Sequence, residues 1–293
     1  MSKERSGLTD KLALATTKVE SILRGKTKLT DQEMQSWIDE CYEFYRLVSS
    51  KEAISIFEGI PTQEKVQYLE AAIKLYNKLR NVPPHGFQEV KMLLKGACAW
   101  LFSLFAERNG KSLSVLLKTL SKCGADFNSV YHKLDMAVEC YNAVISFWEA
   151  AADMDVFRDL PPLELQFIKI CVFSCMLFKL GVCFSAEDNK SFKSLFTKAL
   201  ELSQSLPTRH KLQLVDKLMS FGQQISNDEK QLSKAASYFQ QAHDMLERLG
   251  SSKDIALLGG QEDKEEKAAL MRDVMEMKIK VNLYLVFTYA KDK

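Results

Sequence analysis

The chain has 293 residues, of which 46% are hydrophobic, enough to bury one large core or two smaller ones. Its 40 lysines and arginines nearly balance 38 aspartates and glutamates, so the net charge of +2 gives no electrostatic reason to expect a nucleic acid or another polyanionic partner. The first residues, MSKERSGLTDKLALATTK, are polar and lack the apolar segment of a secretory signal.

Seven cysteines are present, an odd number without the spacing of a disulfide-rich domain, which favours reduced thiols in a nuclear or cytosolic protein. Three of them lie in the apolar stretch FIKICVFSCMLFKLGVCF, residues 167–184. This stretch is the one candidate for a membrane span, but Lys169 and Lys179 interrupt it near both ends. We therefore favour a buried helix of a soluble protein.

Apolar residues recur three and four positions apart along the whole chain, and no stretch alternates with a period of two. With only 12 glycines and 6 prolines, this pattern predicts an all-helical protein. Thr30 with Glu33, and Ser226 with Glu229, have the spacing of a capping box at a helix start. We expect breaks near residues 25–30, 59–62, 82–87, 109–112, 159–162, 185–189, 206–208 and 250–262.

The first part of the chain, residues 1–110, is predicted to form helical hairpins. The stretches WIDECYEFYRLVSSKEAISIF (37–57) and EKVQYLEAAIKLYNKL (64–79) resemble one hairpin, and GFQEVKMLLKGACAWLFSLFAERNG (86–110) is a further apolar helix. Aromatic residues in these helices and the later ones stand beside aliphatic residues at helical spacing, so we expect them to pack in the core rather than to stack on nucleic acid. They are Tyr42, Phe44, Tyr45, Tyr68, Tyr76, Trp100, Phe102, Phe105, Phe147 and Trp148.

Three stretches share the pattern Leu-x2-apolar-Gly-x2-apolar: LSKCGADF, LFKLGVCF and LMSFGQQI, centred on Gly124, Gly181 and Gly222. A glycine inside a helix costs about 1 kcal/mol relative to alanine, so a repeated glycine needs a packing reason. After each stretch comes a second helix that carries small, branched or aromatic residues at similar spacing. In the three copies these are Ala137, Tyr141 and Val144; Phe192, Phe196 and Ala199; and Ala235, Phe239 and Ala242.

This spacing is typical of tetratricopeptide hairpins, in which the glycine lets two helices approach while the aromatic residue fills the groove. The copies begin 57 and 41 residues apart, longer than the regular period of 34 residues. We therefore predict that residues 111–293 continue the first part as an irregular tetratricopeptide-like solenoid with a terminal helix, a right-handed superhelix whose concave groove binds a peptide or helix of another protein.

The first helix of each glycine hairpin is expected to line that concave groove. Solvent-facing residues between its packing positions are the candidates for partner contacts. These candidates are Lys122, Asp126, Lys179, Gln223 and Gln224.

The segment GSSKDIALLGGQEDKEEK, residues 250–267, is predicted to be an exposed acidic connector. The helix after it keeps apolar residues close to its end, whereas a finished solenoid normally closes with a polar face. This helix either binds a protein or a second copy of the chain, or precedes further repeats, or is tucked into the core. The residues in question are Val281, Leu283, Leu285, Val286 and Tyr289.

No catalytic, cofactor or metal site is expected. The GKT at residues 25–27 lacks the glycine five residues earlier and the preceding strand of a phosphate-binding loop. The four histidines, at positions 85, 132, 210 and 243, are scattered without a second ligand nearby. Cys171 and Cys175 lie one turn apart and could share a metal with Cys183, but cysteines of an apolar helix are usually small core residues. We therefore expect a protein that is not an enzyme and has no small-molecule substrate.

The segment from Trp100 to Ala290 resembles the amino-terminal tetratricopeptide region of meiotic crossover scaffolds of the Zip-four or Spo-twenty-two family. The resemblance is carried by CGADFNSVYHKLDMAVECYNAVISF, by LELQFIKICVFSCMLF, and by the run from KSFKSLFTKALEL to RHKLQLVDKLMSFGQQISNDEKQLSKAASYFQQAHDMLERL. It covers about two thirds of the chain, and family members are usually several times longer.

The resemblance implies a nuclear, chromosome-associated scaffold that promotes meiotic crossover formation and synaptonemal complex assembly. It brings no catalytic residues. The alternative from the hairpin pattern is a tetratricopeptide-like subunit of a cytoplasmic assembly that acts in trafficking, in the proteasome lid or in the cell cycle. An enzyme or a small-molecule-binding helical domain is the third reading, and it would require a deep polar pocket with clustered ionisable groups.

Overall fold

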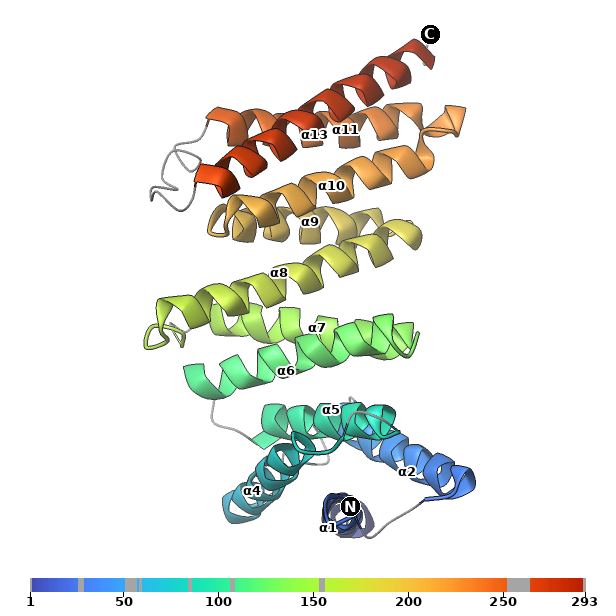
Figure 1. Cartoon of the computed structure of the whole chain (residues 1–293), viewed down its shortest axis with the longest axis vertical. Helices are drawn as coiled ribbons and strands as arrows, with labels where there is room; N and C mark the ends of the chain where they lie inside the picture. The colour runs from blue at the N-terminus through green and yellow to red at the C-terminus, as the bar shows by residue number, and fades with distance from the viewer. Residues whose placement is uncertain are drawn as a thin grey trace. The chain divides into compact units, whose positions relative to one another are not determined.

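The computed structural model of the chain describes residues 2–25, 29–50, 57, 60–83, 86–105, 109–152, 156–251 and 264–291. Within these ranges it contains eleven α-helices, one 3₁₀ helix and no strand (Figure 1). Most helices pack against near neighbours in the sequence, as in a solenoid of helical repeats. The predicted all-α, solenoid-type fold is confirmed.

The helices in chain order are α1 Ser2–Leu23, α2 Asp31–Ser49, α4 Thr62–Leu79, α5 Gln88–Phe105, α6 Gly110–Ser129, α7 Leu134–Ala152, α8 Pro162–Ser185, α9 Asn189–Gln204, α10 Thr208–Ile225, η1 Glu229–Gln231, α11 Leu232–Ser251 and α13 Lys264–Lys291. The contacts divide the chain into two compact units, Met1–Cys175 and Met176–Lys293. The division expected at residue 110 rests on sequence motifs and stays a prediction.

Local signals set several helix ends, but one predicted cap is wrong. The capping box at Thr30 is present: the Thr30 amide donates to Glu33 Oε2 at 2.8 Å, and the Glu33 amide donates to Thr30 Oγ1 at 3.3 Å. Ser226 instead ends α10, and its hydroxyl donates to the carbonyl of Gln223. Asp228 rather than Ser226 caps the following 3₁₀ helix, which spans Glu229–Gln231. Its carboxylate accepts from the Lys230 amide at 3.0 Å.

The first hairpin is built differently from the sequence prediction. Helices α2 and α4, which were expected to pair with each other, both pack mainly on α5 (Figure 1). The reason lies in α5, where ten of its 18 residues are buried, so apolar surface is available to more than one neighbour. Helix α1 packs on α4 and completes this group of four helices.

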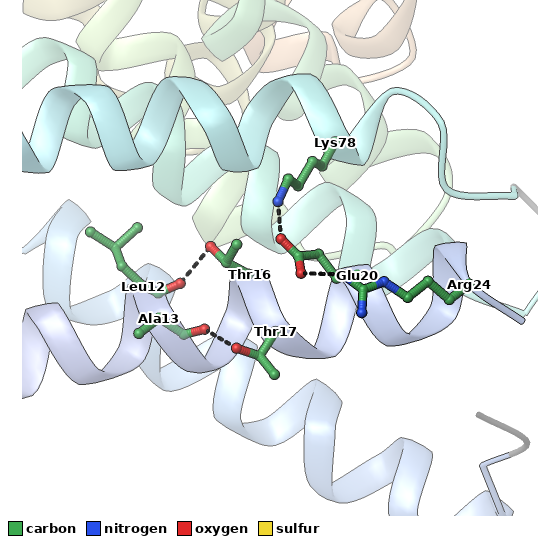
Figure 2. A network of polar contacts seen from close by, with 7 residues as sticks. All are labelled: Leu12, Ala13, Thr16, Thr17, Glu20, Arg24 and Lys78. Atoms are coloured by element: carbon green, nitrogen blue, oxygen red, sulfur yellow. Dashed lines mark hydrogen bonds and ion pairs between the residues drawn. The ribbon is translucent and has the colours of Figure 1, made fainter. Parts of the chain in front are cut away.

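A polar contact joins α1 to α4 beside their apolar faces. The Glu20 carboxylate accepts from Lys78 Nζ of α4 and, at 3.3 Å, from Nη2 of Arg24, which directly follows the end of α1 (Figure 2). The hydrogen bond and the charge of Lys78 lower the pKa of Glu20 below its usual value. On the same helix, Thr16 Oγ1 donates to the Leu12 carbonyl at 2.7 Å and Thr17 Oγ1 to the Ala13 carbonyl at 2.9 Å, so these hydroxyls are satisfied locally.

Two helix pairs pack most closely: α6 with α7 in the first unit, and α10 with α11 in the second. In the second unit α11 packs against both α10 and α13. It runs antiparallel to each of them (Figure 1). These two regions hold the first and third of the predicted glycine-bearing hairpins.

Among the described residues, α8 is the one helix that is long and apolar enough to cross a membrane. Its side chains also make protein contacts. Near its start Glu164 accepts from Lys118 Nζ of α6 at 2.8 Å, and near its end Phe184 stacks on Phe221 of α10 with ring centroids 4.4 Å apart. By length and composition alone such a helix is weak evidence for a membrane span.

The ten aromatic residues expected in the core are all buried or half-buried. Several form ring pairs, such as Tyr45 with Phe127 at 5.3 Å and Tyr68 with Phe105 at 5.6 Å between centroids. All seven cysteines are free thiols, and six are buried. Burial raises the pKa of Cys175 to about 12, so this thiol stays protonated and unreactive at neutral pH.

Candidate protein-binding groove

Two of the three repeat glycines lie under an aromatic ring of the following helix. A methyl group at Gly124 would lie 2.6 Å from Cε1 of Tyr141, and one at Gly222 would lie 2.7 Å from Cε1 and Cζ of Phe239. Real carbon contacts do not come that close, so each ring occupies the space that a side chain would need. These are the aromatic residues that the repeat pattern assigned to the second helices.

Gly181 does not show this arrangement. A methyl group there would have Lys217 Nζ, 3.8 Å away on α10, as its nearest neighbour. The aromatic residue expected to approach it, Phe196 of α9, has no atom within 4 Å of that methyl position. Its ring lies beside that of Phe192, one turn earlier on α9, at 6.3 Å between centroids, and Phe192 packs against Phe221 and Tyr238 at 5.6 and 5.7 Å. No side chain of α9 occupies the space next to Gly181, so the second copy is not a tight glycine crossing.

The five residues proposed as groove contacts lie on three different helices, α6, α8 and α10. Lys122 Nζ pairs with Asp126 Oδ1 on the next turn of α6 at 2.6 Å. Lys179 of α8 is half-buried, whereas Gln223 and Gln224 of α10 are exposed, and Gln224 Nε2 donates to Ser220 Oγ at 3.2 Å. Their role in binding a partner stays a prediction.

A cavity of about 910 Å³ lies within the first unit, between α2, α4, α5 and α7, and none of those five residues lines it. Small side chains leave this space open: Ser103 on α5, and Ala143 and Ser146 on α7. Trp100 and Phe147, both half-buried, contribute an apolar surface to the same lining. We name this feature the unit-1 groove; it combines apolar contact area with room for side chains of a partner.

A hydrogen-bonded network fixes the floor of the unit-1 groove. Trp100 Nε1 donates to the Tyr45 hydroxyl at 3.2 Å, and this hydroxyl also shares a hydrogen bond with Cys140 Sγ at 3.3 Å. Burial raises the pKa of Tyr45 and of Cys140, the latter to about 12, so both groups stay neutral and keep these bonds. The indole ring of Trp100 is thereby held in one orientation under the cavity.

Charges of opposite sign stand at the edges of the unit-1 groove. Arg46 of α2 and Lys65 of α4 contribute cations, while Asp135 and Glu139 contribute carboxylates one turn apart on α7. The Arg46 guanidinium lies 5.2 Å from the ring centroid of Tyr42, which orients it. A peptide or helix with apolar side chains flanked by charges of both signs would match this lining.

The position of Glu139 at the edge of the unit-1 groove raises the pKa of its carboxyl group. Although much of its side chain is exposed, partial shielding of the carboxyl from water raises its pKa; the charge of Asp135 raises it further, and Arg46 opposes the shift. The folded state therefore binds a proton here more tightly than the unfolded chain. Ionisation of Glu139 costs stability as pH rises through the folded pKa, and this cost persists at neutral pH.

We expect Glu139→Gln to raise the melting temperature relative to wild type at pH 7 but not at pH 4, where the wild-type carboxyl is already protonated. Thermal unfolding by circular dichroism at both pH values measures the difference. In an Asp135→Asn background the gain at pH 7 should shrink, because one cause of the raised pKa is gone. An equal gain at both pH values would contradict the electrostatic explanation.

The sequence reasoning missed the groove because it treated Trp100 and Phe147 only as core residues. One signal was available: Asp135 and Glu139 share a face of α7 with the small residues Ala143 and Ser146. That α2, α4 and α5 stand opposite this face is a tertiary fact with no local signature. Among the described residues, no group of three histidine, cysteine or acidic side chains is placed to hold a metal ion.

The last helix, α13, buries only some of the apolar residues near its end. Val281 and Leu285 are buried, at 0% and 9% exposure, whereas Leu283, Val286 and Tyr289 are exposed by half or more. The expectation of a helix tucked into the core is right for one face of α13 and wrong for the other. GKT at residues 25–27 and the connector at 250–267 fall largely outside the described residues, as does His85.

Comparisons of the chain with protein-family models, with curated proteins and with solved structures found no significant match. None of them identifies a meiotic crossover scaffold, so that resemblance stays a prediction. A function for this chain is therefore inferred from the geometry of its two units.

Proposed function

We propose that the protein is a non-enzymatic scaffold that binds a helical or extended segment of another protein in the unit-1 groove. The observation that carries this proposal is the groove itself, whose lining combines the apolar surface of Trp100 and Phe147 with charged residues of both signs, Arg46 of α2 and two carboxylates of α7. Stacked helices form a fixed framework on which such a segment can be bound without large rearrangement.

The finer proposal is that this scaffold acts at chromosomes in the nucleus, in meiotic crossover formation and synaptonemal complex assembly. It is supported by the family resemblance in residues 100–290. A trafficking, proteasome-lid or cell-cycle assembly in the cytoplasm is the competing setting. The two settings predict different partners and different expression, restricted to meiotic cells in the first and general in the second.

The test is an affinity pull-down with the full chain from meiotic and somatic extracts, read by mass spectrometry. The bait Ser146→Trp places a large ring into the groove from its exposed rim, and Ala150→Trp, one turn further along α7, is exposed but does not line the cavity. We expect partners that wild type and Ala150→Trp retain to be lost from Ser146→Trp, with about a tenfold or greater loss of affinity for a purified partner segment.

Partners recovered equally by all three baits would contradict binding in the groove. Recovery of crossover or synaptonemal components in the meiotic extract supports the chromosomal setting. Recovery only of trafficking, proteasome-lid or cell-cycle components from both extracts would overturn that setting and leave the scaffold proposal standing.

A further inference from the structure

Helix α13 has two apolar faces, and one of them is covered within its own unit. Val274, Val281 and Leu285 are buried against the rest of the unit, and Tyr284 stacks on Phe239 of α11 with ring centroids 5.1 Å apart. An ion pair of 2.9 Å between Lys278 and Glu247 closes the edge of this contact. The attachment of α13 to α11 is therefore complete without the second face.

The second face is exposed and regular. Met271, Met275, Ile279, Leu283 and Phe287 follow one another at steps of four residues, with exposures of 50%, 62%, 61%, 52% and 63%. Steps of four residues turn only about 40° around a helix, so these side chains form a continuous ridge. Val286, at 65%, lies next to it, and Tyr289, at 51%, lies beside Val286 one turn further along. We name this feature the α13 ridge.

We propose that the α13 ridge pairs with the same ridge of a second copy of the chain. The two helices run antiparallel, with the twofold axis next to Ile279. The ridge is symmetric about Ile279 in spacing and in chemistry, since an apolar side chain stands four and eight residues away on each side. A twofold contact requires such self-complementarity, and packing of ridges with a step of four is the commonest helix-helix class.

In this arrangement Ile279 meets Ile279 of the second copy, and Met275 lies beside Leu283 of the second copy. Met271 and Phe287 stand at the rim, where a thioether next to an aromatic ring is a favourable contact. Each of the five residues of the ridge has an apolar counterpart. The exposed Arg272, two turns before Ile279 on the same face, lies near the end of the contact beside Val286 of the second copy.

The charges around the ridge favour a second copy over a charged partner. Lys280 Nζ pairs with Glu276 at 2.6 Å, and Lys278 pairs with Glu247. The two lysines that flank Ile279 therefore each bring their own carboxylate, and the approach of an identical surface is not opposed by a net charge. A membrane surface or an acidic peptide would instead be matched by unpaired cations.

The exposed area is also close to what a dimer needs. If each of the seven apolar side chains leaves about 100 Å² exposed, roughly half of an aromatic side chain, the surface amounts to roughly 700 Å² in each copy. Stable interfaces bury about 800 Å² per partner, and apolar patches above a few hundred Å² are uncommon on monomers.

Light scattering coupled to size exclusion tests the proposal on the full chain at micromolar concentration. We expect twice the chain mass for wild type, and the mass of one chain for Ile279→Asp, because two like charges would meet at the twofold axis and raise the Kd by about a hundredfold or more. Leu163→Asp, at an 81% exposed apolar position of α8, serves as the matched control and should stay dimeric. A monomeric wild type, or a dimer unaffected by Ile279→Asp, would overturn the proposal.

A disulfide cross-link tests the register of the proposed antiparallel α13 pair. Its expected result is the appearance of a covalent dimer rather than the loss of a complex. Two helices packed 8–10 Å apart leave roughly 3.5–5.5 Å between facing Cα atoms, within reach of a disulfide. In a Cys171→Ser background, which removes the half-buried thiol, Ile279→Cys should form a covalent dimer under mild oxidation. Asp273→Cys, exposed on α13 and about 120° around the helix from Ile279, should not. Equal cross-linking of both variants, or none at position 279, would show that the ridge does not pair in this way.

Discussion

Replacing Phe239 by alanine is expected to lower the free energy of unfolding by about 3–5 kcal/mol, the range for removing a buried aromatic side chain. The ring is 1% exposed, lies over Gly222 of α10, and stacks on Tyr284 of α13 at an interplanar angle of 18°. It therefore links the three helices α10, α11 and α13. Urea denaturation followed by far-ultraviolet circular dichroism measures the loss.

The contact between the ring and the glycine can be isolated by a double-mutant cycle. Gly222→Ala alone should destabilise by about 1–2 kcal/mol, because overpacking against Phe239 exceeds the gain in helix propensity. In the Phe239→Ala background the space is free, so the same substitution should be neutral or stabilising by up to about 1 kcal/mol. Additive effects of the two substitutions would contradict the packing role of the glycine.

The second large effect concerns two glycines of the same sequence pattern: their replacement by alanine should change the free energy of unfolding in opposite directions. Gly124→Ala should lower the free energy of unfolding by about 1–2 kcal/mol, because the new methyl group would lie 2.6 Å from Tyr141, whose ring is 6% exposed. Gly181→Ala should raise it by about 0.5–1 kcal/mol, because the helix gains propensity and the nearest atom is 3.8 Å away at the end of Lys217.

The same urea titration compares the two variants, and each is the control for the other because both change one glycine to alanine inside a helix. Circular dichroism of the native states should show equal helix content. If both variants were destabilised alike, Gly181 would have a packing role that its surroundings do not show.

The unit-1 groove and the α13 ridge share no residue, so their tests are independent. Ser146→Trp should lose the partner segment and remain dimeric, and Ile279→Asp should become monomeric and keep the partner segment. This pattern separates a failure of the proposed binding function from a failure of the proposed self-association. A variant that lost both properties would indicate a general loss of folding, which circular dichroism detects.

The sequence by itself determined the helices, because their signals are local. The spacing of apolar residues, the capping box at Thr30 and the prolines at 161 and 162 act within one or two turns, and the corresponding helix starts lie where they were expected. The pairing of Gly124 with Tyr141, and of Gly222 with Phe239, was also within reach, because each hairpin joins helices that are adjacent in the chain.

The tertiary structure alone decided which apolar face meets which neighbour. Gly181 carries the same local pattern as the other two glycines, yet no ring of α9, the expected Phe196 included, lies within 4 Å of a methyl group placed there. The pairing of α2 and α4 with α5, the hollow between α5 and α7, and the exposed ridge of α13 likewise have no local signature. Hydrophobic contact is not directional, so an apolar stripe specifies that a face will be covered but not by which element.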